Sequence, residues 1–135
     1  MKYIYLAPEV ELPEISYLEP FKAIVVVDSV VSSKWQAQVS SWLVDSGCRY
    51  MMAWGTDCSS WDDSVDFASL EAFNFQDTPE DRFVMTTWHS DDPLEEVFSY
   101  AKYSAQHPVL ELKHLVIVHI TQNGQRDFKE AYESA

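Results

Sequence analysis

Four side chains have the residue types that nucleophilic catalysis requires. Cys58 and His89 could form a nucleophile–base pair, in which Asp28 or Asp57 orients the histidine. Each of the four comes shortly after a hydrophobic segment of the chain, so all could meet at one edge of a sheet. Such a meeting can also be coincidental, because order along the chain does not fix contact in space. Cys58, His89, Asp28 and Asp57 are therefore the candidate catalytic residues.

The same region offers oxygen and nitrogen ligands for a cation, in Asp57, Asp62, Asp91 and His89. Hard cations need several oxygen ligands, and neither an EF-hand nor a His-x-x-x-His spacing is present. The chain also lacks a Gly-rich phosphate loop and its lysine. The sequence therefore predicts no metal and no cofactor.

Acidic residues are concentrated in one part of the chain. Residues 57–96 contain twelve Asp and Glu residues against Arg82 alone, a net charge of −11 out of −13 for the whole chain. Acids near helix starts complement the helix dipole and aid solubility, which is one interpretation. The other is a negative patch that attracts a basic partner. On this second interpretation the candidate binding acids are Asp62, Asp63, Asp91 and Asp92.

Three tryptophans flank the ends of predicted strands within or beside this acidic segment, namely Trp54, Trp61 and Trp88. Each could fill the core with its indole N–H bonded to a loop carbonyl. Each could equally be an exposed anchor, because tryptophan is enriched among residues that dominate binding energy. The three are kept as candidate binding residues.

The net charge of −13 argues against several partners. An acidic surface repels phosphate backbones and anionic lipid, so we expect no direct nucleic-acid and no membrane binding. The first residues lack a secretory signal pattern and no apolar run is long enough to span a bilayer, which predicts a cytoplasmic protein. Cys48 and Cys58 fit that compartment as reduced thiols, although a disulfide between them is an alternative.

Periodicity predicts an alternation of strands and helices. Continuous apolar runs predict buried strands, and an apolar face recurring every three to four residues predicts helices. The predicted strands are 23–27, 49–54, 82–88 and 114–120, and the predicted helices begin at Ser33, near Ser60 or Asp62, at Asp92 and near Asn123.

Local signals refine the helix predictions. Ser33 and Gln36 have capping-box spacing, and Gly47 suits the left-handed residue that closes a helix. The second helix has a less regular face, for which we predict Val65, Ala68, Leu70 and Phe73. The third helix has Asp92 as N-cap and Pro93 as first residue. The last is a short helix within 122–135, with Phe128, Ala131 and Tyr132 on one side.

This order predicts a single α/β domain over residues 1–135. Helical crossovers between apolar strands indicate a three-layer αβα sandwich with a mainly parallel four-stranded sheet. The expected order of the four strands is 2-1-3-4, as in doubly wound, Rossmann-like folds. Residues 2–6 could add an edge strand, and the rest of 1–20 reads as an extended arm.

Two strings in the sequence are distinctive. They are MMAWG-x-DC-x-x-WDD at 51–63 and RFVMTTWH at 82–89. Together they resemble a family of small bacterial proteins known only as a domain of unknown function, over about residues 21–121. The resemblance implies a bacterial, cytosolic protein and brings no activity, cofactor or site residue.

The residues themselves support two function hypotheses. The first is a small acidic binding protein that docks a basic protein partner through an acid- and Trp-rich face, as an immunity or defence-associated accessory protein would. The second is a small enzyme that uses Cys58, His89 and Asp28 or Asp57 on a polar small molecule. A homodimer that covers Trp54, Trp61 and Trp88 is a further possibility for the same surface.

Overall fold

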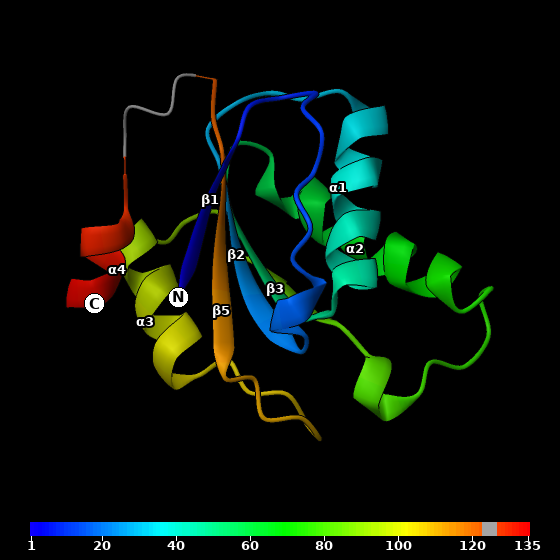
Figure 1. Ribbon diagram of the computed structural model, residues 1–135. Coiled ribbons are helices and arrows are strands. Elements are labelled where there is room, and N and C mark those ends of the chain that lie inside the picture. The colour runs from blue at the N-terminus through cyan, green and yellow to red at the C-terminus, as the bar shows by residue number, and fades with distance from the viewer. Residues whose placement is uncertain (123–126) are drawn as a thin grey trace.

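The computed structural model describes residues 1–122 and 127–135. Within them, short segments alternate between strand and helix from one end of the chain to the other (Figure 1). The elements are β1 (Lys2–Leu6), η1 (Ser16–Leu18), β2 (Phe21–Val27), α1 (Ser33–Ser46), β3 (Cys48–Gly55), α2 (Cys58–Ala72), η2 (Glu80–Arg82), β4 (Met85–Trp88), α3 (Leu94–Tyr103), β5 (His114–Ile120) and α4 (Lys129–Ser134).

The strands form one parallel sheet in the order β1-β5-β2-β3-β4. The predicted edge strand at 2–6 is confirmed, and it pairs with β5 along its whole length, from Lys2 opposite Val116 to Leu6 opposite Ile120. β2 lies at the centre between β5 and β3. The parallel α/β class is thereby confirmed, with five strands instead of four.

The predicted strand order 2-1-3-4 is wrong. It would have put strand 23–27 between strands 49–54 and 82–88, whereas β3 separates β2 from β4. The reason lies in which face each helix covers. α1 and α2 lie on the same face, so two successive right-handed crossovers move the chain in one direction, and α3 on the other face brings it back past β2 to β5 (Figure 1).

The core consists of two apolar layers, one on each side of the sheet. Under α1 and α2, the odd-numbered β2 residues Val25 and Val27 pack with Trp35, Trp61 and other buried side chains. Under α3 and α4, Ile24 and Val26 pack with Phe98 and Ile117. Both faces of the central strands are therefore covered, which is why β2 reads as an unbroken apolar run.

The first helix begins at Ser33, as predicted, but its capping residue is not the one that the capping-box spacing indicates. Ser32 is the N-cap and accepts the backbone N–H of Trp35 at 3.1 Å, while Gln36 donates its side-chain amide to Ser60 on α2 instead of closing a capping box. Gly47 closes α1 with a φ of 106°, as predicted. A residue with a Cβ would be strained at this backbone angle.

The remaining differences are of one to three residues at element ends. α2 begins at Cys58, two residues before Ser60 and four before Asp62, the two predicted caps. α3 begins after Pro93 instead of after Asp92. A short 3-10 turn at Glu80–Arg82 delays the fourth strand to Met85. The predicted cap Asn123 lies outside the described residues, and α4 follows at Lys129. The arm after β1 is extended but buries Ile15.

The second helix faces the sheet with a different set of side chains from the one predicted. Val65 and Ala68 are buried as expected, whereas Leu70 is exposed and Phe73 lies beyond the helix end. The buried face consists of Cys58, Trp61, Asp62, Val65, Ala68 and Ser69. Aromatic residues are consequently left on the outside of α2.

Candidate functional site

Large apolar side chains gather on the outer side of α2 and on the chain that leads from it into β4. Phe67, Phe75, Phe83 and Trp88 keep between 45% and 58% of their surface exposed. Phe67 and Phe75 contact each other edge to face, with ring centroids 5.6 Å apart. Exposed aromatic groups of this kind are unusual on a surface that has no partner.

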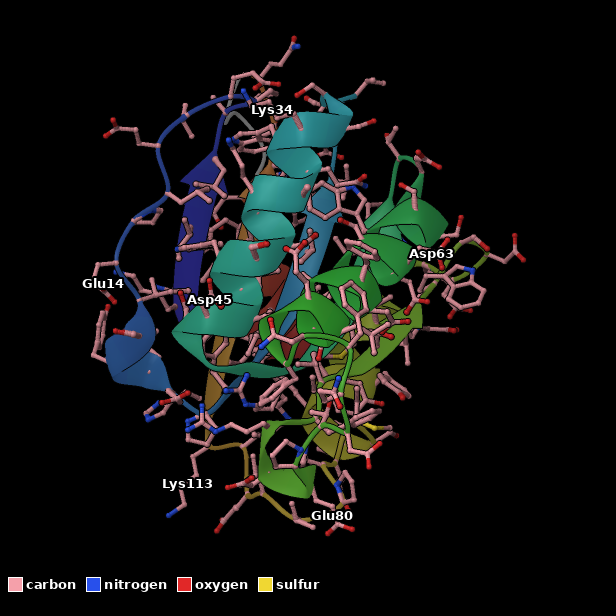
Figure 2. The ribbon with its side chains drawn as sticks, turned by 90° about the vertical axis from the view of Figure 1, so that its right-hand side faces the viewer. Glu14, Lys34, Asp45, Asp63, Glu80 and Lys113 are labelled. Atoms are coloured by element: carbon pink, nitrogen blue, oxygen red, sulfur yellow. The ribbon has the colours of Figure 1, made fainter. Side chains whose placement is uncertain are left out.

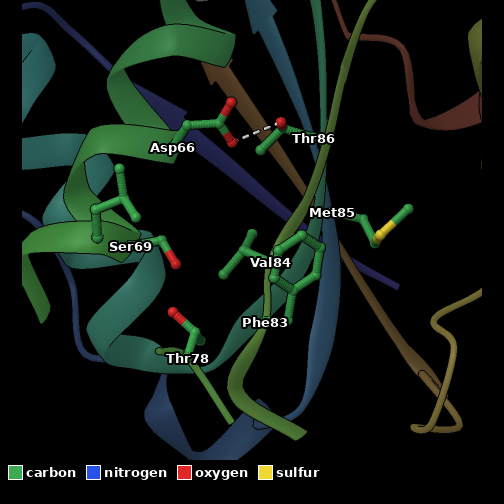
Figure 3. A pocket seen from close by; sticks show the side chains of 8 residues that line it. Asp66, Ser69, Thr78, Phe83, Val84, Met85 and Thr86 are labelled. Carbon is green, nitrogen blue, oxygen red and sulfur yellow. Dashed lines mark hydrogen bonds between the residues drawn. The ribbon is translucent and has the colours of Figure 1, made fainter. Parts of the chain in front are cut away.

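A pocket of about 410 Å³ lies between α2 and β4 (Figure 3). Leu70, Phe83 and Val84 give it apolar walls, and Asp66, Ser69 and Thr78 supply polar groups. At one end the Thr86 hydroxyl donates to Oδ1 of Asp66 at 2.7 Å. The pocket therefore has apolar walls and a carboxylate at one end.

Two carboxylates one turn apart on α2 differ in their surroundings, since Asp62 is buried and Asp66 is exposed. Asp62 is only 7% exposed, and its Oδ1 has no hydrogen-bond partner among the described residues. Asp66 follows one turn later on the same helical face. Desolvation raises the pKa of Asp66, and the nearby Asp62 and Asp63 raise it further, while the Thr86 hydroxyl acts in the opposite direction. Burying an oxygen without a donor costs free energy, so Asp62 would be stabilised by a donor from outside the described residues.

Further acids surround the aromatic side chains. Asp63 and Glu71 are exposed on α2, and Asp77, Glu80 and Asp81 are exposed on the segment that follows. Figure 2 views the molecule from the α1 and α2 side, with Asp63 on α2 and Glu80 on the loop below it. We call the surface formed by these side chains with Asp66, Phe67, Leu70, Phe75, Phe83 and Trp88 the acidic–aromatic face.

The structure does not assemble the predicted nucleophile–base pair. Cys58 is buried in the layer under α1 and α2. His89 stacks edge to face on Tyr100 of α3, on the other side of the sheet, and bonds Thr87 at 2.9 Å and Asp92 at 3.2 Å. In residues 1–122 and 127–135 no hydrogen bond joins Cys58 to His89. Asp57 is exposed, and its backbone carbonyl accepts the Ser60 amide.

Both cysteines are free thiols, so no disulfide joins Cys48 to Cys58. Cys48 is fully buried, and burial raises the pKa of its thiol to about 12. Cys58 is also buried, with 3% of its surface exposed. A buried thiol away from a base behaves as a small apolar side chain.

Asp28 instead contacts His119, which was not among the candidate catalytic residues. Nε2 of His119 lies 2.5 Å from Oδ2 of Asp28, and Nδ1 lies 2.9 Å from the Tyr3 hydroxyl. The Phe128 amide donates to the same hydroxyl at 3.0 Å. A proton on Nε2 satisfies every contact, with Tyr3 donating to Nδ1.

This network joins four parts of the chain at the carboxyl ends of β2 and β5. Strands β2 and β5 are neighbours followed by helices on opposite faces, a position where open α/β sheets often bind ligands. Here, however, His119 is fully buried and both of its ring nitrogens are engaged within the protein. Burial also raises the pKa of Tyr3 to about 12. The network is arranged to hold the sheet edge together.

The three candidate tryptophans have different surroundings. Trp61 is buried in the core, so it cannot be a surface anchor. Trp54 is half-buried, and its indole donates to the Asp92 carbonyl at 2.8 Å. Trp88 alone is exposed as an anchor requires. The candidate acids divide similarly, with Asp62 buried and Asp63, Asp91 and Asp92 exposed.

Sequence reasoning missed Asp66, Phe67, Phe75, Phe83 and Thr86. The usable signal was the spacing of Trp61, Val65 and Ala68, which defines the buried stripe of α2 and leaves Phe67 outside it. The pairing of Thr86 with Asp66 had no signal, because it depends on how α2 lies over β4.

Neither a metal centre nor a membrane segment is visible within the described residues. No three His, Cys, Asp or Glu side chains among them gather as cation ligands. None of the described helices is long and apolar enough to cross a membrane.

One comparison with known proteins finds a family, and it is a domain of unknown function, as the resemblance implies. No curated protein and no solved structure matches the chain. A family model matches residues 1–135, beyond the 21–121 covered by the resemblance, so the chain belongs to the family described as domain of unknown function (DUF7684).

Proposed function

We propose that this protein is a binding domain that docks a basic protein partner through the acidic–aromatic face. The observation that carries the proposal is the exposure of Phe67, Leu70, Phe75 and Phe83 on α2 and the segment after it, which also carry exposed acids. Of these acids, Asp63 and Glu71 lie beside Phe67. Aromatic side chains at the centre of a patch supply most of the binding energy at protein interfaces. Charges at the rim determine which sign of charge the partner must carry, and they increase its association rate.

Electrostatics supports a basic partner. The segment 57–96 has a net charge of −11, and most of its acids stand exposed around α2 and β4. A positive surface would be steered to this face and would relieve the mutual repulsion of its carboxylates. A second copy of the same face would bring like charges together, so the interaction of two copies here is opposed.

The aromatic anchors differ from those expected from the sequence. Trp88 is retained, while phenylalanines on α2 and the following segment replace Trp54 and Trp61. The immunity or defence-associated role suggested by composition is one form of this function, in which the basic partner is a toxin. Bacterial origin and a cytoplasmic location belong to the same proposal.

Site-specific cross-linking tests the proposal. A photoreactive phenylalanine analogue at Phe67 should cross-link a basic protein in cells of the native host, and the same group at exposed Tyr17 should not. The product, identified by mass spectrometry and purified, should bind the protein with an affinity that falls steeply as salt increases.

Matched charge reversals complete the test. Asp63→Lys with Glu71→Lys should abolish most of this binding, because both acids lie on α2 beside Phe67. Glu14→Lys with Asp45→Lys makes the same change in net charge on the arm and on α1, and should preserve it. Equal losses from the two pairs would show that only net charge matters, and no loss from either would refute the acidic–aromatic face as the docking surface.

The geometry does not favour the alternative of a Cys/His/Asp enzyme. Cys58 and His89 lie against opposite faces of the sheet, and Asp28 is engaged by His119.

A further inference from the structure

Strand β4 ends the sheet with an open edge beside the pocket. It pairs with β3 alone, and the described part of the chain adds no strand beyond it. The His89 amide donates to the Ala53 carbonyl at 3.0 Å, and this bond establishes which alternate residues of β4 bond to β3. In a parallel pair alternate residues bond to the neighbouring strand. Thr87 therefore faces β3, whereas Thr86 and Trp88 direct their N–H and C=O groups outward.

An exposed row of unpaired backbone N–H and C=O groups is a template for a further strand. Proteins protect such edges with lysines, prolines or bulges, yet residues 85–88 contain none of the three in Met-Thr-Thr-Trp. Peptide-binding domains use the same feature, since backbone hydrogen bonds supply affinity and pockets for alternate side chains supply specificity. β4 has both, because Thr86 belongs to the open edge and also lines the pocket.

The pocket suits one class of side chain. Leu70, Phe83 and Val84 can cover an aliphatic stem, and Asp66 can receive a charged head. Oδ1 of Asp66 accepts from Thr86, and the Asp66 side chain is exposed, so its other oxygen is open to a donor from outside the protein. Oδ1 of Asp62, one turn away on α2, also has no partner among the described residues, although Asp62 itself does not line the pocket. Lys and Arg combine an apolar stem with a cationic head.

Resting on the function proposed above, we infer that the partner contributes an extended basic segment, which adds to β4 as a further strand and places a Lys or Arg side chain in the pocket against Asp66. The surrounding acids receive the other cationic residues of the segment, and Phe83 and Trp88 contact its apolar residues. Pairing of two β4 strands from separate copies would bring their acids together, so the occupant is a basic segment and not a second copy.

A synthetic peptide that alternates Arg and Val serves as the probe. Three forms are compared on the full-length protein by calorimetry: unmodified, N-methylated at every Arg, and N-methylated at every Val. An added strand directs one alternate set of amides to β4 and the other to solvent. One methylated form should therefore lose at least about tenfold in affinity, as expected for lost backbone hydrogen bonds, while the other binds like the unmodified peptide.

Two isosteric variants test the pocket. Asp66→Asn should weaken binding of the unmodified peptide by about tenfold, because it removes a charge-assisted contact. Asp45→Asn makes the same chemical change at an exposed position on α1, outside the acidic–aromatic face, and should weaken binding by no more than about twofold. Thermal unfolding of both variants confirms that each remains folded.

Amide hydrogen exchange gives the structural readout. Peptide binding should slow exchange at Thr86 and Trp88, whereas Thr87 already faces β3 and should change little. Strand addition is overturned if both methylated forms bind like the unmodified peptide, if no form binds, or if exchange at Thr86 and Trp88 is unchanged. The pocket assignment is overturned if Asp66→Asn and Asp45→Asn have equal effects. Any of these results leaves the docking function to be decided by cross-linking and charge reversal.

Discussion

Asp28 and Asp66 are carboxylates beside the same sheet with opposite surroundings. Asp28 meets a buried histidine at 2.5 Å, and that histidine is held in turn by Tyr3. Asp66 receives a single hydroxyl, and its nearest charged neighbours are two further acids. One carboxylate completes a network within the protein, and the other is left incomplete. The contrast separates a group that stabilises the fold from one available to a partner.

The same contrast applies to the two regions. At the carboxyl ends of β2 and β5, side chains from β1, β2 and β5 and the amide before α4 satisfy one another. At β4, an orphaned carboxylate oxygen, an open strand edge and exposed aromatic rings remain without partners among the described residues. Mutations in the first region should therefore reduce stability, and those in the second should reduce binding while stability is retained.

The largest effect is expected from His119→Ala. The change leaves a cavity at a fully buried position and removes the partner of both Tyr3 and Asp28. We expect the free energy of unfolding to fall by about 3 kcal/mol or more, measured by urea denaturation. Thr86→Ala, which removes one hydroxyl from the open region, is the control and should cost less than about 1 kcal/mol. A loss for His119→Ala no greater than this control would contradict the structural role of the network.

A smaller effect is expected from Asp28→Asn. The amide oxygen can still accept the Nε2 proton, so the contact survives and only its charge is lost. Unfolding should become easier by about 1 kcal/mol at neutral pH. If the variant instead lost as much stability as His119→Ala, the charge of Asp28 and not its position would be the important property.

The fold followed from the sequence where periodicity was strong. The strand at 114–120 and the edge strand at 2–6 were predicted to the residue, because both are short apolar or alternating runs with clear ends. The sheet order was not predictable from the same evidence. It depends on α1 and α2 sharing a face, and the apolar stripe of a helix does not say which side of the sheet it covers.

The site was less predictable, because its members meet only through packing. The acidic segment was recognised as a candidate binding surface from charge alone. His119 appeared as one polar residue in a buried strand, and nothing in the sequence connected it with Tyr3, which is 116 residues away. Phe67 and Phe75 could not be assigned to the surface until the buried side of α2 was known.

Asp66→Asn should have a smaller effect on the free energy of unfolding than His119→Ala or Asp28→Asn, and it should increase stability instead of reducing it. Desolvation raises the pKa of Asp66, so the folded protein binds a proton on the Asp66 carboxylate more tightly than the unfolded chain does. Stability is therefore lost as pH rises from the ordinary aspartate pKa of about 4 through the raised value. The variant should gain a few tenths of a kcal/mol at pH 7, because the side chain is exposed and solvent screens the effect. Denaturation at pH 3 and pH 7 measures the gain, which should vanish at pH 3.

Neither cysteine should react readily with a thiol reagent while the protein is folded. Cys48 begins β3, which lies beside the central strand β2, and Cys58 begins α2, one turn before the unsatisfied Asp62. Because both thiols are buried, a thiol reagent such as DTNB should label neither in native buffer and both in urea. Slow labelling of Cys58 alone would measure local opening of the region around α2, because the labelling rate is proportional to the opening equilibrium constant. It would indicate that this region opens more readily than the network around His119. Rapid labelling of Cys58 would instead contradict its burial and restore the enzyme hypothesis, since a catalytic thiol must be open to its substrate.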